Sequence, residues 1–403
     1  MTAEQQFFIQ ILADHVHGRP SAPETDSLNW EKVYYYAQEQ ALPGLVYVQT
    51  KDFFKDHKDI APDMGVKLHQ GFYSDVYLYA NRRAEFQAFA RQCREVPMVL
   101  MKGIALQEYY PVPALRSMGD IDVVIHTEDR EKTDRVMLEN GYSKMVNNHA
   151  VWTYDKDYIE FEIHDHMFYE YLANDIDYRS YFDQIWDHIS QVEGEENLYI
   201  PDEEFHFLFL ITHLAKHITN KGIGFRGFLD LTFMIKREGR QMDWQWIQSE
   251  LAKLKLLDFT KTCFALCRKW FDLEMPIETG DLDPDFYSQV TAKMFNDGMF
   301  GLENEQNEAA HAAKEIKRSK DSYWISAAKL TIHRLFPPYQ DMQLVPWYSF
   351  VDGRPWLLPL AWVYRWFYTA THKFKQSKDL LTEPFAKRKV IEKRENLIRG
   401  WGL

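Results

Sequence analysis

The spacing of apolar residues predicts a chain that is mostly helical. Phe7, Phe8, Ile11 and Leu12 repeat with the period of one helix face. A longer helical pattern occupies 63–95, where no proline interrupts it. Helical periodicity returns after residue 201, in the segments 202–220, 225–239, 242–257 and 258–273. We therefore expect helical regions on both sides of a middle segment of different character.

The middle segment, 96–200, carries strand patterns. Short apolar runs at 96–101 and 121–125 predict buried strands, and a helix is expected at 127–140, with Thr127 as its N-cap. Further strands are predicted at 142–146, 150–154 and 158–164. The fold class predicted is α+β, with a mixed β-sheet embedded in a mostly helical protein. The expected regions are an N-terminal helical region (1–95), an α/β core (96–200), a helical domain (201–335) and an aromatic, proline-rich segment with a basic tail (336–403).

Composition narrows the class of protein. The chain has 403 residues and a net charge of −13, which disfavours a general electrostatic grip on nucleic acid. Only Cys93, Cys263 and Cys267 are present, so a disulfide framework is excluded and a reducing compartment is expected. The N-terminus lacks the pattern of a signal peptide, and no apolar stretch reaches the ~18 residues of a membrane span. We expect a cytoplasmic protein.

Two aspartates alternate along the second predicted strand. Alternate side chains of a strand share a face, so Asp120 and Asp122 point the same way, while Ile121 and Val123 point into the core. Neighbouring carboxylates repel each other unless a cation neutralises them. Mg²⁺ prefers oxygen ligands and binds through one or two carboxylates together with substrate phosphates. The alternative is a pair of solvated acids on a half-exposed strand.

Other residues near this pair suit phosphate chemistry. Gly103 opens a short helical stretch at 104–110, where backbone N–H groups can approach an anion. In the last predicted strand, Glu160, Glu162 and His164 share one face, which supplies a third carboxylate. Lys102, Arg116 and Gly119 precede the acids in the sequence. The combination predicts a two-metal site for phosphoryl transfer.

These residues resemble the nucleotidyltransferase superfold, whose pattern is a glycine turn, two alternating aspartates and a later acidic strand. More narrowly, the chain resembles a bacterial family of uncharacterised nucleotidyltransferases, sometimes labelled nucleotidyltransferase family 5. The resemblance covers roughly 40–370, and its matching segments are 100–106, 116–125, 141–142, 162–164, 213–217 and 225–230.

The resemblance implies transfer of a nucleoside monophosphate from an NTP to an acceptor, with Mg²⁺ or Mn²⁺ as cofactor. Asp120 and Asp122 would bind both metal ions, and Glu162, or else Glu160, would complete the catalytic set. Nucleotide-binding residues would be Lys102, Gly103, Arg116, Gly119, His164, His213, His217 and Arg226. The serine that usually follows the turn glycine is missing here, so backbone N–H groups and Lys102 are expected to hold the phosphates.

The histidines allow three interpretations. His213 and His217 lie one helical turn apart, with His206 two turns earlier, and His164 and His166 flank Asp165. Zinc hydrolases use such i, i+4 pairs with a glutamate between them, which this chain lacks. The pair can instead line a nucleotide cleft or pack as ordinary hydrogen-bonded side chains.

Two further features have a structural and a functional interpretation. Arg226 and Asp230 lie four residues apart, so they predict an ion pair within a helix or a buried strut between helices, or else an arginine that faces the triphosphate or the acceptor. The apolar residues between 356 and 370 fit one face of a core-packed helix, or a membrane or protein contact extending over 356–399. The tail from 371 to 403 holds nine Lys or Arg and four Asp or Glu.

The sequence therefore predicts a Mg²⁺-dependent nucleotidyltransferase that acts from an NTP, expected to be ATP, on a hydroxyl-bearing small molecule or protein. The competing hypothesis is a non-catalytic nucleotide-binding or scaffold protein on the same fold. The missing serine favours the competing hypothesis, and the intact aspartate pair opposes it.

Overall fold

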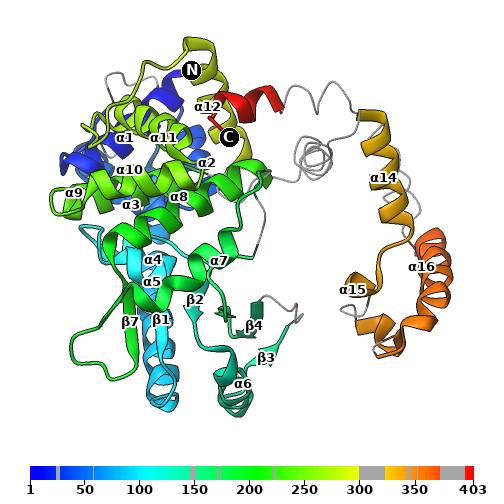
Figure 1. Cartoon of the computed structure of the whole chain (residues 1–403). Helices are drawn as coiled ribbons and strands as arrows, with labels where there is room; N and C mark the ends of the chain where they lie inside the picture. The colour runs from blue at the N-terminus through cyan, green and yellow to red at the C-terminus, as the bar shows by residue number, and fades with distance from the viewer. Residues whose placement is uncertain are drawn as a thin grey trace.

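The structure is a computed structural model that describes residues 1–23, 28–57, 59–145, 151–169, 172, 174–220, 224–298, 323–342, 346–351, 353–372 and 395–403. Predictions that involve 146–150, 299–322 or the tail segment 373–394 lie outside the described residues. Within the described part, the fold is α+β, as the sequence predicts (Figure 1).

A mixed seven-stranded sheet lies in the middle of the fold, with the strand order β3-β4-β5-β2-β1-β7-β6. The central strand β2 pairs in parallel with β5 and antiparallel with β1, and β1 pairs in parallel with β7. Hairpin partners complete the two edges. The strands are β1 (Met98–Leu100), β2 (Asp120–Val124), β3 (Ser143–Lys144), β4 (Val151–Lys156), β5 (Ile159–His164), β6 (Ile189–Gln191) and β7 (Leu198–Pro201).

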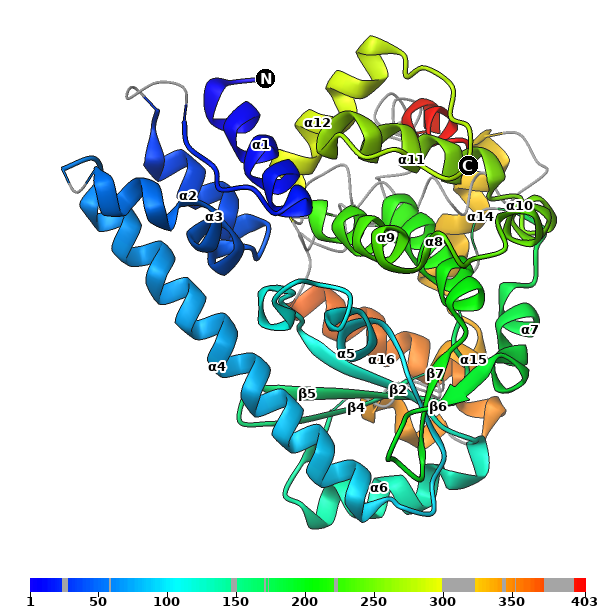
Figure 2. The same ribbon diagram turned by 90° about the vertical axis from the view of Figure 1, so that its left-hand side faces the viewer.

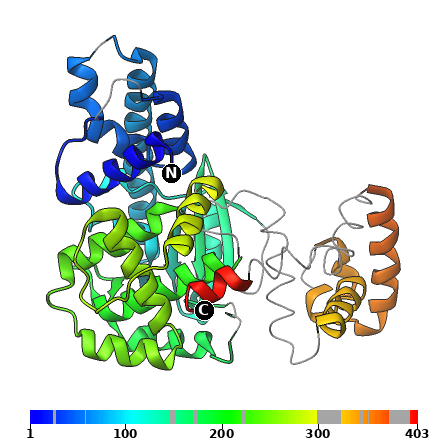
Figure 3. The ribbon, with the colours of Figure 1, turned by 90° about the horizontal axis from the view of Figure 1, so that it is seen from above.

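The N-terminal region is helical, as the apolar periodicity predicts. It consists of α1 (Ala3–His17), α2 (Trp30–Glu39), α3 (Pro43–Asp56) and the long α4 (Pro62–Gln92). Thr2 begins α1 with a capping box, in which its side chain and that of Gln5 bond each other's backbone N–H. Figure 3 shows α1 to α3 gathered together beside the later helices.

A second group of helices follows the sheet and lies close to its predicted positions. Its members are α8 (Glu203–Asn220), α9 (Phe225–Glu238), α10 (Trp244–Lys253), α11 (Leu257–Phe271) and α12 (Pro284–Asp297). The C-terminal residues return to this group, because Trp401 is buried against the rings of Phe228, Phe259 and Phe286. The remaining helices are α5 (Lys102–Gln107), α6 (Arg130–Glu139), α7 (Tyr178–Phe182), α14 (Tyr323–Leu335), α15 (Tyr339–Met342) and α16 (Leu358–His372), with 3-10 turns at 113–115, 127–129, 183–187, 346–351 and 355–357.

The two faces of the sheet meet different partners. Ile121, Val123 and Phe161 pack with Phe89 of α4 and Met137 of α6 in one apolar cluster. Figure 2 shows α4 and α6 on this side of the sheet, and α8 and α9 on the other. Because side chains alternate along a strand, the residues between these apolar positions of β2 and β5 face the α8–α9 side. The alternation therefore presents Asp120, Asp122, Glu160 and Glu162 to α8 and α9.

Some local predictions are wrong. Thr127 does not cap a helix: it begins a 3-10 turn, α6 starts at Arg130, and the Thr127 hydroxyl donates to Asp165 Oδ2 at 3.3 Å. The apolar face predicted within 356–370 is exposed, because α16 packs through Ala361 and its neighbours instead. Trp356, in the 3-10 turn before α16, and Phe367 of α16 are each 71% accessible. None of the described helices combines the length and apolarity that a membrane crossing requires.

Candidate active site

Four carboxylates lie on one face of two paired strands. In the parallel register of β2 and β5, Asp120 is opposite Glu160 and Asp122 is opposite Glu162. The sequence predicts that these acids converge, and the register brings them side by side. Apolar residues between the acids anchor both strands in the core beneath, so the positions of the carboxylates are fixed by the sheet.

The acidic face forms the floor of a cavity of about 530 Å³. Its other walls come from α5, the loop before β2, α8 and α9. Nearly all the residues singled out in the sequence line it; His164 is not in the lining but contacts two of the acids from the side. The polar and glycine residues of the wall are Lys102, Gly103, Arg116, Gly119, Asp120, Asp122, Glu160, Glu162, His213, Lys216, His217, Gly224, Arg226, Gly227 and Asp230.

Asp122 is the most constrained of the four acids. Its side chain is 1% exposed, and Oδ1 accepts hydrogen bonds from Lys102 Nζ at 2.6 Å and His164 Nε2 at 3.1 Å. His164 Nε2 also lies 3.4 Å from Glu162 Oε2. Asp122, Glu162 and His164 each present a ligand atom within 4.8 Å of the others, which is a spacing that one metal ion can bridge.

The acids of β2 have opposite protonation tendencies. Burial alone would raise the pKa of Asp122, but Lys102 and His164 outweigh it and hold this pKa well below its usual range. Repulsion from Asp122, followed by burial, raises the pKa of Asp120. Burial and the charge of Asp120 likewise raise the pKa of Glu160. The cluster thus holds more negative charge than Lys102 and His164 neutralise, and the excess favours a further cation.

Lys102 and Gly103 are the first two residues of α5, directly after β1. Lys102 has a left-handed φ of +41°, and its ammonium is directed to Asp122. Lys102 therefore faces the acidic cluster and not the solvent. Gly103 has no room for a side chain, since an added Cβ would lie 2.7 Å from Met118 Sδ. Glycine at this position lets the β1–α5 turn pack tightly against the loop that precedes β2.

Two arginines enter the cavity wall with different partners. Arg116 forms a buried, two-pronged ion pair with Asp230, with Nε–Oδ1 at 2.9 Å and Nη2–Oδ2 at 2.8 Å. Tyr110 also donates to Asp230, at 2.8 Å. Arg226 donates to the Ser117 carbonyl at 2.6 Å. The predicted i, i+4 pair of Arg226 with Asp230 is therefore wrong, because Arg116 occupies both carboxylate oxygens.

Arg226 stays cationic in this setting. Burial, and then the charge of Arg116, lower its pKa to about 10, which still leaves the guanidinium protonated at neutral pH. Its hydrogen bonds in the described structure go to the carbonyl and hydroxyl of Ser117, which carry no charge. Arg226 consequently brings a positive charge to the cavity opposite the acidic floor.

The histidine pair of α8 forms part of the wall. His213 Nε2 and His217 Nε2 are 2.8 Å apart, so one ring donates to the other. Burial and the positive groups around it lower the pKa of His213, which keeps this ring neutral. Among the described residues, three possible metal ligands come together at Asp122, Glu162 and His164. His213 and His217 do not belong to this group. The zinc interpretation of His213 and His217 is therefore not supported.

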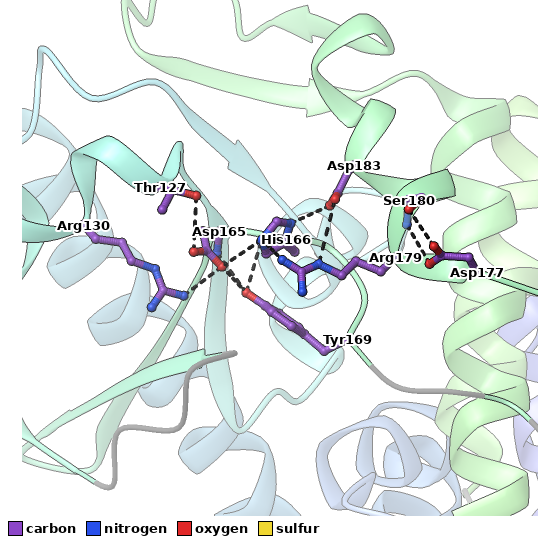
Figure 4. A network of polar contacts seen from close by, with 9 residues as sticks. All are labelled: Thr127, Arg130, Asp165, His166, Tyr169, Asp177, Arg179, Ser180 and Asp183. Atoms are coloured by element: carbon purple, nitrogen blue, oxygen red, sulfur yellow. Dashed lines mark hydrogen bonds and ion pairs between the residues drawn. The ribbon is translucent and has the colours of Figure 1, made fainter. Parts of the chain in front are cut away.

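Beyond β5, the chain is tied down by a separate polar network (Figure 4). His166 Nδ1 lies 2.7 Å from Asp183 Oδ1, and Arg179 contacts the other ring nitrogen. Asp165 pairs with Arg130 at 2.8 Å and accepts from Tyr169. The residues that flank His164 therefore fasten the end of β5 to α6 and α7, and they do not contribute to the acidic cluster.

Sequence reasoning missed several residues of the site. The sequence pattern pairs Asp230 with Arg226, and it assigns no role in the site to Tyr110 or Lys216. The signal for Asp230 was weak, because its partner Arg116 lies 114 residues earlier in the chain. Leu106, Leu210 and Leu214 supply the apolar part of the wall.

The comparisons with known proteins agree with this geometry. The model of a family described as uncharacterised nucleotidyltransferase matches residues 26–272, which is more than half of the chain. The match includes the whole sheet together with α8, α9 and α11, and so every residue of the cavity wall. Searches of curated proteins and of solved structures found no significant match.

Proposed function

Because the chain belongs to a family of uncharacterised nucleotidyltransferases, we propose that it transfers a nucleoside monophosphate from an NTP to a hydroxyl-bearing acceptor. The acceptor oxygen attacks the α-phosphorus, the bond from that phosphorus to the β-bridging oxygen breaks, and pyrophosphate leaves. The proton of the hydroxyl passes to a carboxylate of the cluster, which we assign to Glu162. ATP is the donor that we expect.

The observation that carries this proposal is the paired acidic face over the cavity. Asp120, Asp122, Glu160 and Glu162 stand on adjacent strands in register, with cationic Lys102 and Arg226 in the same cavity. A surface without a binding function would not place four acids together above a buried core, because their mutual repulsion lowers the stability of the fold. A substrate that carries both phosphates and divalent cations complements this arrangement.

The donor set fits a divalent cation. Asp122 and Glu162 offer carboxylate oxygens, which Mg²⁺ and Mn²⁺ prefer, and His164 adds a nitrogen within the same group. Asp120 would complete the set from the next position on the same face of β2. When bound, such a cation neutralises charge on the phosphates and on the leaving pyrophosphate.

The protein's own residues then position the substrate. Arg226 brings its guanidinium to the phosphates from α9, held in place by the Ser117 carbonyl. Lys102 is placed at the end of the acidic cluster, where its ammonium can move from Asp122 to a phosphate oxygen. The buried Arg116–Asp230 pair holds the loop before β2 against α9, which keeps the two walls in register.

One observation favours the competing non-catalytic function. Lys102 already neutralises Asp122, so the ammonium takes a position beside the carboxylate that a metal ion would otherwise fill. A scaffold of this kind would bind a nucleotide without turnover. Catalysis requires the Lys102 ammonium to leave Asp122 and bind the substrate. Nucleotide binding without turnover would show that Lys102 does not make this exchange.

The test combines binding and turnover. Titration calorimetry of ATP is run with and without Mg²⁺, and pyrophosphate release is measured with the same protein. We expect Mg²⁺-dependent binding and a slow release with water as acceptor, both lost in Asp122→Asn. Lys236→Gln serves as the control, since this residue lies on α9 outside the cavity. Tight binding with no release on any acceptor would support the scaffold, and no binding would refute both.

A further inference from the structure

A second cavity lies against the loop that precedes the catalytic strand β2. It has a volume of about 330 Å³ and is enclosed by α4, the turn between α2 and α3, and residues 114–118. Arg116 and Met118 belong to the walls of both this cavity and the acidic one. The two cavities are therefore neighbours, separated by the loop that leads into Asp120. The volume is at the lower end of the ~300–1,000 Å³ range of small-molecule pockets.

Arg82 of α4 brings a guanidinium to this second cavity. Its Nε is buried and has no hydrogen-bond partner among the described residues. A buried N–H without an acceptor costs about 1–3 kcal/mol, so such groups are uncommon unless a ligand or water supplies the acceptor. Burial lowers the pKa of Arg82, and the charges of Asp120 and Asp75 oppose this shift.

Asp75, two turns of α4 earlier, is the acidic counterpart. Its Oδ2 accepts from the Gly44 backbone N–H at 3.1 Å, and no hydrogen bond of Oδ1 is found among the described residues. Asp75 and Arg82 have opposite charges when Asp75 is ionised, and burial raises the pKa of this carboxyl to about 7. The ionised pair disfavours a strongly anionic or strongly cationic occupant. Pro43, Leu78 and Tyr79 add apolar surface to the same wall.

We propose that this second cavity binds the acceptor, and that the acceptor is a small neutral polyol such as a sugar or a cyclitol. A hydroxyl both donates and accepts, so vicinal hydroxyls can donate to Asp75 and accept from Arg82 at the same time. The apolar wall meets the C–H face of the same ligand. The ligand's reacting hydroxyl points past Met118 toward the α-phosphate held over Asp120.

This inference rests on the proposed function, and it narrows the acceptor from any hydroxyl compound to one class. With Asp75 ionised, the opposite charges of Asp75 and Arg82 distinguish a neutral polyol from a cationic amino sugar or a sugar phosphate. Transfer joins the polyol oxygen to the α-phosphorus and releases pyrophosphate, so the product is a polyol nucleoside monophosphate diester.

The first experiment measures binding without any nucleotide. Saturation-transfer difference NMR is recorded on the full chain with myo-inositol, glucose, glucosamine and glucose 6-phosphate as probes. We expect signals from myo-inositol or glucose that are at least fivefold stronger than those of the charged probes. Arg82→Gln and Asp75→Asn should each abolish the signals, whereas Arg91→Gln, an exposed position on the same helix, should retain them.

The second experiment measures transfer. With MgATP present, the polyol that binds should accelerate pyrophosphate release in a saturable way. Arg82→Gln should raise the KM for polyol at least tenfold more than the KM for MgATP. Thermal unfolding of each variant distinguishes a local effect from loss of the fold.

The outcomes separate the two proposals. Polyol binding that Arg82→Gln and Asp75→Asn leave unchanged, or preferential binding of a charged probe, overturns the inference. A protein that releases pyrophosphate with water but neither binds nor uses a polyol also overturns it, while the proposed function stands. Polyol binding that depends on Arg82 in a protein without MgATP turnover supports the site and refutes the reaction.

Discussion

The two aspartates of β2 should respond in opposite ways when each loses its charge. Charge repulsion alone predicts that both substitutions stabilise the fold. The structure changes this expectation for Asp122, because its buried carboxylate pairs with Lys102 at 2.6 Å and His164 at 3.1 Å. Asp120 forms no ion pair with another described residue, and the repulsion from Asp122, together with burial, raises its pKa more than the charge of Lys102 lowers it. Asp122→Asn should therefore lower the free energy of unfolding, and Asp120→Asn should raise it.

The magnitudes follow from burial. Removing one partner of a buried ion pair costs about 3–5 kcal/mol. The Lys102 side chain is 18% exposed, so its ammonium can partly reach water, and we expect a loss of about 2–3 kcal/mol for Asp122→Asn. Relief of repulsion in Asp120→Asn should gain about 1 kcal/mol. The depressed pKa of Asp122 means that its contribution is fully present above the ordinary carboxyl pKa near 3.8 and is lost as the pH falls below it.

The assay is chemical denaturation at pH 7 with EDTA present, so that bound metal does not contribute. Pyrophosphate release with Mg²⁺ is measured on the same variants, and both should lose it. The reasoning fails if Asp122→Asn is as stable as Asp120→Asn, since the pairing with Lys102 would then contribute nothing. Equal activity of either variant and the parent would refute the proposed chemistry.

Three further substitutions test other parts of the site. Arg226→Ala should weaken MgATP binding by about 1.5–3 kcal/mol, the size of hydrogen bonds to a charged group, and calorimetry with exposed Arg240→Ala as control measures this. Burial raises the pKa of Asp75 to about 7, so the parent should lose stability relative to Asp75→Asn as the pH rises from 4 to 8, by at most about 4 kcal/mol. If the difference between the two denaturation midpoints does not change with pH, this prediction is contradicted. Gly103→Ala should lower stability by about 1–3 kcal/mol, because the new methyl group meets Met118, and a thermal unfolding scan would show the loss.

The sequence predicts the acidic face well because its signal is local. Alternation along a strand is enough to place Asp120 with Asp122, and Glu160 with Glu162. The helices after residue 201 can be predicted equally well, because their apolar residues repeat with a regular helical period. By contrast, the sequence pattern does not reveal β6 and β7, because each has only three or four residues. The partner of β7 is β1, about 100 residues earlier in the chain, and β6 joins the sheet through β7.

Contacts between distant segments explain the other errors. Periodicity places Arg226 and Asp230 on one helix face, yet the carboxylate is taken by Arg116 from the loop before β2. Likewise, the sequence indicates that Lys102 lies at a turn, and only the packing of β1 beside β2 directs its ammonium to Asp122. The pattern of residues along one sequence does not tell which of several charged side chains will pair with a given carboxylate.

These long-range pairs also show why the site is not a property of the sheet alone. The segment 96–200 contains the acids, but Arg226, Asp230 and the histidine pair reach the cavity from α8 and α9. Arg116 within that segment has its carboxylate partner outside it, so separation would leave a buried guanidinium uncompensated. Under the proposed function, the sheet supplies negative charge for cations, and the helices supply positive charge for phosphate. The buried Arg116–Asp230 pair fastens the loop before β2 to α9 and so holds these two parts of the cavity wall together.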